Sequence, residues 1–515
     1  MEREESESGV SPWMPDPGDG TYRNPVLHAD YSDPDVIGVN GDFYMTSSSF
    51  HHIPGLPILH SRDLVNWRLI GHALRRMPLP GYGRPQHGRG VWAPSIRHHA
   101  GKFWIFYGDP DVGIFMTTAE DPAGEWSPLH LVQAGKGLID PCPLWDEDGR
   151  AYLVHAFAES RSGIRDKLRV CPMDPDGRRI GEGRIVFDDP VNHPTIEGPK
   201  FYKRNGYYYI FAPAGGVPQG WQTVLRASNP YGPYEDRIVL RQGGSPVNGP
   251  HQGGWVELEN GESWFLHFQD KDAYGRIVHL QPVAWENDWP RIGEPGADGV
   301  GTPVLRFRKP AAGVGSPVAA PAATDEFAAG RPGLQWQWQA NPSPEWTPPG
   351  PAGGLRLRAM PLPEGAATLY DAPHLLLQKF PAPAFEATVE LDVAALKPGD
   401  EAGLVVFGFR HARLAAGRAR SGDRFLAYTE GDPADERVLW RMPLTDDRIG
   451  LRVSVAEGAV CRFAYRSAGG PFRPVDAGPF EAAPGRWVGA KVGLFAAGAD
   501  GDAGYAAFGP FRVTP

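Results

Sequence analysis

A pattern that recurs five times constrains the fold of this chain most strongly. Each copy opens with a glycine followed by aromatic and β-branched residues, as in GKFWIFYGDP and GYYYIFAPAG. The copies begin at Gly41, Gly101, Gly149, Gly206 and Gly261, which lie 48 to 60 residues apart. One strand-rich unit repeated at such a period is typical of a β-propeller. The sequence therefore predicts five blades, with side chains that are distant in sequence converging on a common axis.

A second domain is expected, because 515 residues exceed the usual size of one hydrophobic core. The repeats end near Arg291, and the Ala-, Pro- and Gly-rich stretch after it is typical of a linker. Beyond the linker, segments such as FEATVELDV alternate or run apolar over strand lengths, which favours a two-sheet sandwich. We predict an all-β chain with an N-terminal arm at 1–21, a five-bladed propeller at 22–307, a linker at 308–322 and a β-sandwich at 323–515.

Composition excludes several classes of partner. The formal net charge is −10 and no Lys/Arg cluster is long enough to follow a phosphate backbone, so no nucleic acid partner is expected. No apolar run is long enough to span a membrane, and none is expected to bind one. The acidic start MEREESESGV lacks the features of a secretory signal, and three cysteines without metal-type spacing predict buried, reduced thiols. These features predict a cytoplasmic protein; a secreted protein whose signal has been removed and a homo-oligomer both stay open.

Three carboxylates occupy matching places in different repeats. Asp33, Asp140 and Glu197 each lie in the segment before an aromatic strand, and each is followed by proline directly or after one glycine. If the repeats are blades, these side chains converge on the axis. For any one of them alone, a structural role in a turn is the more frequent case. Asp30 and Asp35 flank Asp33 and compete with it for any role.

Two carboxyl groups on opposite sides of a sugar are what glycosidic hydrolysis requires. One protonates the leaving oxygen, and the other, ionised, deprotonates a water. A third carboxylate nearby would raise the pKa of the acid by repulsion and keep it protonated near neutral pH. The three acidic positions together therefore indicate a glycosidase more strongly than any of them does alone.

Several motifs carry a resemblance to a known family. The segments NPVL…SDPD, GVWAPSI, LIDPCPLWDEDG and IEGPKFYKRNGYYYIF occur in the order and spacing of the family 43 glycoside hydrolases. The chain resembles that family over about residues 22 to 307, and its C-terminal part is similar to the concanavalin-like, jelly-roll sandwich of the β-xylosidases. The resemblance implies a five-bladed propeller that acts on xylan and arabinan side chains with inversion of configuration.

The resemblance also implies roles for individual residues. The general base of the family falls on Asp33, the carboxylate that orients and tunes the acid on Asp140, and the general acid on Glu197. Arg276 is similar to the active-site arginine of the family, and its guanidinium could hold both a sugar hydroxyl and a carboxylate. A surface arginine at a strand end is the alternative.

Further residues are expected around the substrate and at the axis. An apolar wall for a pentose is assigned to Phe50 and Trp92, although bare aromatics are more often core residues. Trp221 and Gln222, where the chain departs from the glycine-rich loop of the family, are also expected to bind substrate. In some family members a histidine at the position of His251 helps to hold calcium with waters, although calcium prefers oxygen ligands. The alternative for His251 is a hydrogen bond to the catalytic carboxylates; plausible polar neighbours are Gln252, Gln269 and Asp270.

These observations predict an exo-acting, inverting glycosidase that releases terminal β-D-xylose, α-L-arabinofuranose or both from xylo- and arabino-oligosaccharides. No organic cofactor is expected. The alternatives are a non-catalytic carbohydrate-binding propeller with a lectin-like sandwich and, more weakly, a protein-binding scaffold. The remaining histidines, among them His51 and His52, lack a metal-like pattern and are expected at the surface or in loops.

Overall fold

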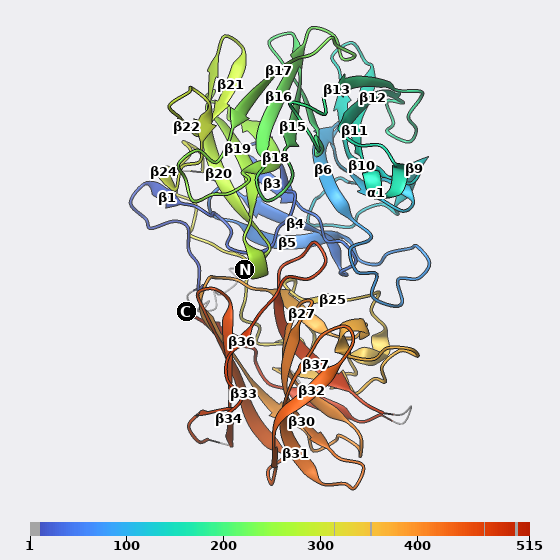
Figure 1. Cartoon of the computed structure of the whole chain (residues 1–515), viewed down its shortest axis with the longest axis vertical. Helices are drawn as coiled ribbons and strands as arrows, with labels where there is room; N and C mark the ends of the chain where they lie inside the picture. The colour runs from blue at the N-terminus through green and yellow to red at the C-terminus, as the bar shows by residue number, and fades with distance from the viewer. Residues whose placement is uncertain (1–10, 314, 351–352, 468, 500–502) are drawn as a thin grey trace, which may run out of the picture.

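The computed structural model describes residues 11–313, 315–350, 353–467, 469–499 and 503–515. Figure 1 shows two bodies stacked along the long axis, with the propeller above and the sandwich below. Nearly all regular structure is β, which confirms the predicted fold class. Within the described residues the only α-helix is the single turn α1 (Glu159–Ser162), and the 3-10 turns are η1 (Asp272–Tyr274), η2 (Pro344–Trp346) and η3 (Leu369–Asp371).

Five antiparallel sheets form the blades, each built from strands that are consecutive in the chain. Their strands are β2 (Asp35–Val39), β3 (Asp42–Thr46), β4 (Gly55–Ser61) and β5 (Arg68–Leu74); β6 (Trp92–His99), β7 (Lys102–Asp109), β8 (Gly113–Ala119) and β9 (His130–Ala134); β10 (Leu138–Trp145), β11 (Ala151–Phe157), β12 (Lys167–Met173) and β13 (Arg184–Asp188); β14 (Lys200–Arg204), β15 (Tyr207–Ala214), β16 (Trp221–Ala227) and β17 (Glu235–Leu240), extended by β23 (Gly301–Thr302) and β22 (Glu294–Pro295); and β18 (His251–Glu257), β19 (Ser263–Asp270), β20 (Arg276–Glu286) and β21 (Trp289–Ile292).

The glycine that opens each sequence repeat lies in the turn between the first and second strand of a blade. All five of these glycines have a left-handed backbone, with φ between 74° and 84°. In three blades the residue before the glycine also has a positive φ, as at Asn40 and Asn205, which is the requirement of the tight hairpin turns that match strand twist. The aromatic residues after each glycine form the buried second strand of the blade. The sequence repeat therefore corresponds to this turn and to the core strand that follows it.

The propeller closes by a separate contact between its ends. β1 (Thr21–Arg23) pairs with β24 (Arg306–Arg308), which brings the start and the end of the domain together. Residues 1–10 of the predicted arm lie outside the described residues. The rest of the arm packs on the propeller, because the Trp13 indole nitrogen donates to the Pro25 carbonyl and the indole ring contacts His28.

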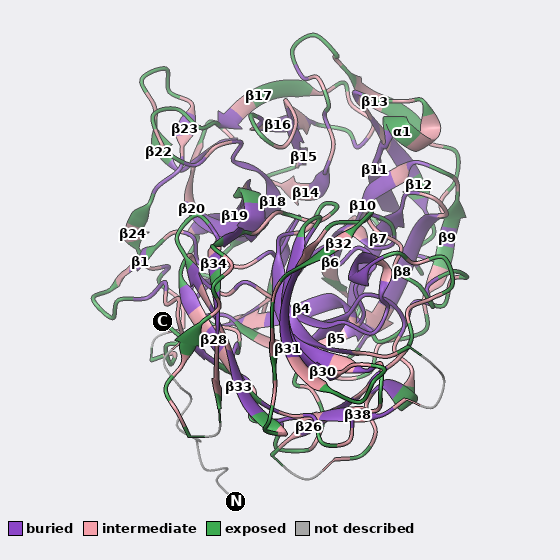
Figure 2. Cartoon of the chain, turned by 60° about the horizontal axis from the view of Figure 1, so that its bottom comes forward, coloured by how far each residue is buried: buried purple, intermediate pink, exposed green. Residues whose placement is uncertain are grey.

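Two antiparallel sheets form the sandwich around one core. Figure 2 shows buried stretches along many of these strands, and the core between the sheets includes Leu404, Leu451 and Leu494. One sheet runs β25 (Gln337–Trp338), β27 (Leu376–Lys379), β37 (Lys491–Ala497), β29 (Glu401–Phe407), β30 (His411–Arg418), β31 (Arg424–Gly431) and β32 (Glu436–Pro443). The other runs β26 (Leu355–Arg358), β38 (Tyr505–Phe508), β28 (Phe385–Asp392), β33 (Arg448–Ala456), β34 (Val460–Ser467) and β35 (Arg473–Pro474), with β36 (Phe480–Glu481) and β39 (Arg512–Thr514) beside it.

Two smaller findings bear on the sequence predictions. Cys142, Cys171 and Cys461 are buried and unpaired, as expected. None of the helices in the described part of the chain is long and apolar enough to cross a membrane.

Candidate active site

One backbone irregularity is repeated where the innermost strand of every blade begins. A residue with positive φ lies there in each blade, with φ of 55°, 29°, 56°, 56° and 52° in chain order. Except at Gly198, a side chain in this region costs backbone energy, so the position marks a site where geometry is kept despite strain. The five residues are Asp33, Ala93, Asp140, Gly198 and Gln252.

Glu197 does not occupy this position but the one before it. The left-handed residue of its blade is Gly198, so Glu197 corresponds to Ser32, Trp92 and His251 rather than to Asp33. The proline that follows Asp33 directly and Glu197 after one glycine therefore marks the same backbone place in both blades. A longer side chain placed one residue earlier brings the third carboxylate to the other two from a different direction.

Three donors converge on the Asp33 carboxylate. The Ser32 and Ser48 hydroxyls donate to Oδ2 at 2.8 and 2.5 Å, and the Arg276 guanidinium donates to Oδ1 at 3.0 Å. Arg276 also donates to Ser32 at 2.7 Å, and Ser48 accepts from the Ala93 amide, so these groups are fixed in turn. These contacts fix the position of the Asp33 carboxylate, and a carboxylate can accept a proton from water.

Glu197 and Asp140 are neighbours whose carboxyl groups differ in their hydrogen bonds. The Asp140 carboxylate accepts from the Gly198 amide at 2.8 Å, whereas no hydrogen bond of the described residues engages the Glu197 carboxyl. Burial raises the pKa of Glu197, the charges of Asp140 and Asp33 add to this, and Arg276 opposes it. Burial also raises the pKa of Asp140, and the Gly198 amide opposes it. The pair therefore holds one proton more readily than isolated carboxylates would, and a proton on Glu197 faces no competing acceptor.

A second charged layer lies behind these carboxylates and resolves the role of Asp35. The fully buried Asp35 accepts from the Ile96 amide at 2.8 Å and from the Arg97 guanidinium at 2.7 Å. The Lys200 ammonium lies 3.9 Å from Asp35 and donates to the Pro94 carbonyl at 2.7 Å. Asp35 is thus held inside an ion-pair network that links the first, second and fourth blades, so it is not free to act on a substrate.

The predicted aromatic wall exists and gains a member from the sandwich. Phe50 and Trp92 lie with ring centroids 6.4 Å apart, and Trp487 of the sandwich lies 6.2 Å from Trp92. Trp487 is 43% exposed and adopts a left-handed backbone at φ 64°. The Arg161 guanidinium lies 5.7 Å from the centre of the Trp92 ring. The three rings meet edge to face at the boundary of the two domains, where Phe50 is buried, Trp92 is half-buried and Trp487 is exposed. The predicted contact of Phe50 and Trp92 with a pentose stays a prediction.

Trp221 and Gln222 lie at the start of β16 and are less open than a substrate role suggests. The Gln222 side chain is 1% exposed, and its oxygen accepts from the Gln252 amide at 3.1 Å. The Trp221 ring packs over Gly215, where a Cβ would lie 2.5 Å from the ring. Both residues support the axial backbone at Gln252 and the loop beside it. Their predicted contact with substrate stays a prediction.

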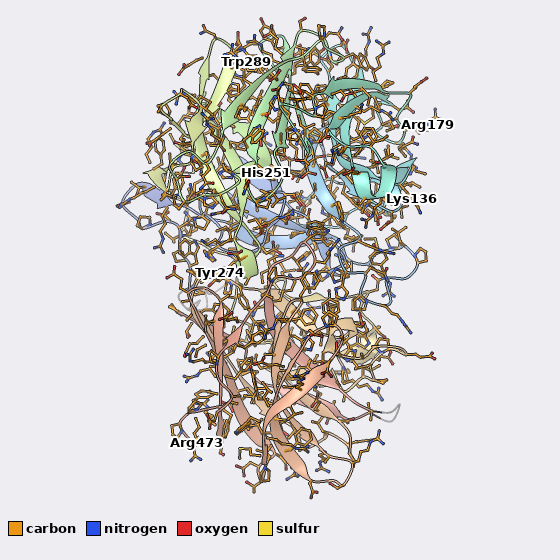
Figure 3. The ribbon with its side chains drawn as sticks, viewed as in Figure 1. Lys136, Arg179, His251, Tyr274, Trp289 and Arg473 are labelled. Carbon is orange, nitrogen blue, oxygen red and sulfur yellow. The ribbon has the colours of Figure 1, made fainter. Side chains whose placement is uncertain are left out.

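His251 lies inside the propeller, as its label in Figure 3 shows. It is fully buried, neither ring nitrogen has a hydrogen-bond partner among the described residues, and burial lowers its pKa to about 3. It therefore does not bond the catalytic carboxylates, which was the alternative. No group of three His, Cys, Asp or Glu in the described residues could hold a metal. The donor set thus does not fit a caged calcium ion, and only an ion held by one imidazole and waters would suit it.

A larger cavity, of about 640 Å³ including its opening to solvent, lies elsewhere at the domain boundary. It is lined by Trp13, His28, Tyr31 and residues 320–323, and none of the three catalytic carboxylates contacts it. The three axial carboxylates therefore lie apart from this cavity.

The convergence of three carboxylates and an arginine on a propeller axis is matched by the sequence families of both domains. Residues 22–290 match the family described as Glycosyl hydrolases family 43, and residues 324–514 match the beta xylosidase C-terminal concanavalin A-like domain. The chain belongs to glycosyl hydrolase family 43. It is accordingly a glycosidase, as the sequence predicted.

Individual family 43 proteins are similar over most of the chain. A putative beta-xylosidase of Xylanibacter ruminicola is 45% identical over 382 residues, which cover 73% of this chain and 70% of that protein. A non-reducing end alpha-L-arabinofuranosidase of Bacteroides ovatus is 31% identical over 410 residues, covering 75% and 73%. The crystal structure of a family 43 protein of Bacillus licheniformis superposes with a TM-score of 0.81 at 25% identity, covering 96% of this chain and 99% of that one. Both domains and their arrangement are thus shared with a relative of known structure.

The site of this family 43 enzyme is tied to the sandwich through Asp30. The Asp30 carboxylate accepts from the Arg276 amide at 3.0 Å and, across the domain boundary, from the Gly489 amide at 2.9 Å. Gly275 and Gly489 allow the two backbones to meet there, since a Cβ on Gly275 would lie 2.6 Å from the Gly489 nitrogen. Nearby, the Ala490 amide donates to the Ala273 carbonyl at 2.7 Å. Asp30 therefore holds the backbone of Arg276 and of the sandwich segment that carries Trp487.

We expect Asp30→Ala to lower kcat/KM by roughly ten- to a hundredfold, because small displacements of positioning groups carry large costs in rate. Both the Arg276 backbone and the Trp487 segment lose an anchor, so KM and kcat should change together. Asp42→Asn is the control, since Asp42 pairs with His60 and Arg62 away from the axis. Steady-state kinetics and thermal unfolding of both variants check this. Unchanged kinetics with a lowered Tm would mean that Asp30 only stabilises the fold.

Sequence reasoning missed four members of the site. Ser32 and Ser48 had a weak signal, because they lie beside Asp33 and in the serine run of the first blade. Asp30 was recognised only as a rival of Asp33. Trp487 had no signal, because nothing in the sandwich sequence indicates which turn reaches the propeller.

Proposed function

We propose that this glycosidase removes single terminal pentose units, β-D-xylose or α-L-arabinofuranose or both, from xylo- and arabino-oligosaccharides with inversion of configuration. The proposal rests on the different surroundings of two carboxyl groups at the propeller axis. One carboxylate, Asp33, is surrounded by donors, and another, Glu197, is partly buried beside a negative neighbour without any donor of its own. Relatives named for xylosidase and for arabinofuranosidase activity support both pentoses.

The geometry assigns each residue a step. Glu197 donates its proton to the glycosidic oxygen as the bond to the leaving sugar breaks. Asp33, ionised and held by Arg276 and two serines, takes a proton from the water that attacks the anomeric carbon from the opposite side. Asp140 keeps the pKa of Glu197 raised and is itself held in place by the Gly198 amide. Arg276 also offers donors to a sugar hydroxyl beside Asp33.

The exo mode follows from what surrounds the carboxylates. The buried network of Asp35, Arg97 and Lys200 lies close to Asp140, on which Lys200 acts electrostatically, and the sandwich adds Trp487 to the aromatic residues at the domain boundary. Such a pocket suits one terminal sugar rather than the interior of a polymer. Hydrolysis of p-nitrophenyl β-D-xyloside, p-nitrophenyl α-L-arabinofuranoside and xylobiose, with the product anomer followed by NMR, tests the proposal. Retained configuration would refute inversion, and background rates on all substrates would favour the carbohydrate-binding alternative.

The alkaline side of the pH profile should depend on Asp140. Activity requires protonated Glu197, so the rate falls as pH rises through the pKa of that carboxyl. The negative charge of Asp140 helps to keep this pKa high. In Asp140→Asn that charge is gone, so we expect a lower rate and an alkaline limb shifted toward lower pH. A pH profile of kcat/KM measures the shift; a limb unchanged in position would leave Asp140 without influence on the acid.

Calcium at His251 remains a proposal. The two unpartnered ring nitrogens support it, and the lack of carboxylate ligands limits it to an ion held mostly by water. Such an ion would add positive charge near the axis. We expect a chelator to reduce activity and added calcium to restore it, with His251→Ala insensitive to both. Full activity of the wild type after chelation would reject a functional metal.

A cytoplasmic location also remains a proposal, supported by three buried, unpaired cysteines. Such an enzyme would complete the breakdown of short oligosaccharides taken up by the cell. Fractionation of the producing cells, with activity assayed in each fraction, tests it. A homo-oligomer stays open and is settled by the mass of the purified protein in solution.

A further inference from the structure

Two histidines expected at the surface or in loops lie in a loop that is buried at the domain boundary. His51 and His52 follow Phe50 and are 1% and 2% exposed. None of their four ring nitrogens makes a hydrogen bond of good geometry within the described residues, and the Gln339 side chain lies beside His51. The loop position was predicted correctly, but its burial was not, because the loop sequence does not reveal that the sandwich covers it. Buried polar atoms without partners are rare and call for a ligand or ordered water.

The sandwich presents two lysines to the same place. Lys491 on β37 is 2% exposed, and Lys379 lies directly opposite it on β27. Like charges at facing positions of neighbouring strands destabilise a sheet unless something compensates them. The Lys379 ammonium lies 5.0 Å from the centre of the Tyr31 ring. In the described part of the chain, no carboxylate lies within 4 Å of either ammonium.

Only one carboxylate has electrostatic influence on both lysines. Asp30 acts on Lys379 and on Lys491, but its oxygens already accept from the amides of Arg276 and Gly489. One anionic group therefore faces the buried Lys491 and the partly exposed Lys379. Burying an unmatched charge costs several kcal/mol, on the order of the net stability of a domain. When Lys491 is protonated, its ammonium has no anionic partner within 4 Å in the described part of the chain.

A cavity lies where that partner is missing. It offers room for one ligand of about the size of a water molecule, about 10 Å³, within an open hollow of about 250 Å³. Its lining includes His51, His52, His87, Gln339, Arg486 and Lys491. The His87 ring lies 4.9 Å from that of His51 and contacts Asp371 at 3.7 Å. Asp371 is half exposed and is thus a weak source of charge inside the cavity. Water could satisfy the imidazole nitrogens, but it could not neutralise the lysine.

We propose that this cavity binds one small inorganic anion of halide size, held by the Lys491 ammonium and by ring N–H groups of His51 and His52. A neutral imidazole offers one N–H donor, and an ammonium offers three. The anion would provide a counter-charge for protonated Lys491 and accept from one ring N–H of each histidine. It would also join two segments that form the mouth of the active site, the loop of Phe50 and the segment Gly485–Gly489 that carries Trp487.

The titration of Lys491 should make anion binding depend on pH. Burial and the charge of Lys379 lower the pKa of Lys491 to about 7, and Asp30 opposes them. An anion stabilises the ammonium form, so binding takes up a proton and becomes tighter as pH falls through neutrality. The other charged or titratable groups that line the cavity are His51, His52, His87, Tyr370 and Arg486, and Asp371 contacts His87. Lys379 and Asp30 act on Lys491 from outside this lining.

Thermal unfolding of the full chain tests the proposal. At slightly acidic pH and equal ionic strength, sodium chloride and sodium bromide should raise Tm above its value in sodium gluconate by about 3 °C, and the increment should saturate with concentration. Lys491→Met should lose this increment. Lys167→Met, which alters an exposed pair with Asp188, should keep it. An equal Tm in halide and gluconate for the wild type would overturn the proposal.

Crystals grown in bromide provide a second test that does not depend on a folded variant. The anomalous signal should show bromide in the cavity, within hydrogen-bond distance of Lys491 and of a ring nitrogen of His51 or His52. Water at that place, with bromide only at the surface as an adventitious ion, would refute the site. A bromide peak there together with a halide-dependent Tm would establish it.

Discussion

Glu197→Gln is expected to lower turnover of xylobiose by about 10³-fold, because glutamine keeps the shape of the acid but has no proton to donate. The loss should be much smaller for p-nitrophenyl β-D-xyloside. Its leaving group is a weak base that departs without protonation, whereas a sugar hydroxyl is a strong base that does not. The ratio of the two losses, measured from steady-state kinetics, identifies the general acid.

The control for this variant is Glu147→Gln, the same chemical change at a carboxylate whose side chain is 90% exposed in a hairpin. It should leave both substrates unaffected. Glu197 makes no side-chain hydrogen bond in the structure, so the folded state should lose little when the carboxyl becomes an amide. An equal loss on both substrates would contradict the assignment of Glu197 as the acid.

The blades could be predicted because the repeated sequence reflects the local needs of a tight turn and a core strand. Each copy pairs a turn glycine at positive φ with a core strand, and both leave a signal in the nearby sequence. The repeat does not, however, predict how far along the propeller axis a given side chain lies. Asp33 and Glu197 seemed equivalent by their prolines, and the structure separates them by one residue relative to the left-handed position.

The contributions of the sandwich to the site could not be predicted. The bond between Asp30 and Gly489 joins residues 459 positions apart, and no periodicity connects them. The strand β30 has the sequence HARLAAGR, whose alanines and arginines favour helix as an isolated segment. Its burial between β29 and β31 overrides that preference. Packing between distant segments, and not local sequence, determines these features.

Asp33→Asn is expected to lower turnover by about 10³- to 10⁴-fold on both xylobiose and the aryl xyloside. Activation of the attacking water is needed whichever group leaves, so the loss should not depend on the leaving group. This result distinguishes the base from the acid, because the loss of turnover in Glu197→Gln does depend on the leaving group. Kinetics on the same two substrates measure both effects, and Asp42→Asn again serves as the isosteric control.

The neighbours of Asp33 make this test sharper. In the wild type, the Ser32 and Ser48 hydroxyls donate to Oδ2 of Asp33. In the variant, the asparagine oxygen can still accept from Arg276, but an NH2 group takes the place of Oδ2 and faces these two hydroxyls. Both hydroxyls can rotate and accept instead, so the fold should survive with a small change in Tm. The variant then removes the negative charge while Arg276 stays in place. A leaving-group-dependent loss in Asp33→Asn would exchange the roles of Asp33 and Glu197, and normal turnover would mean that another group activates the water.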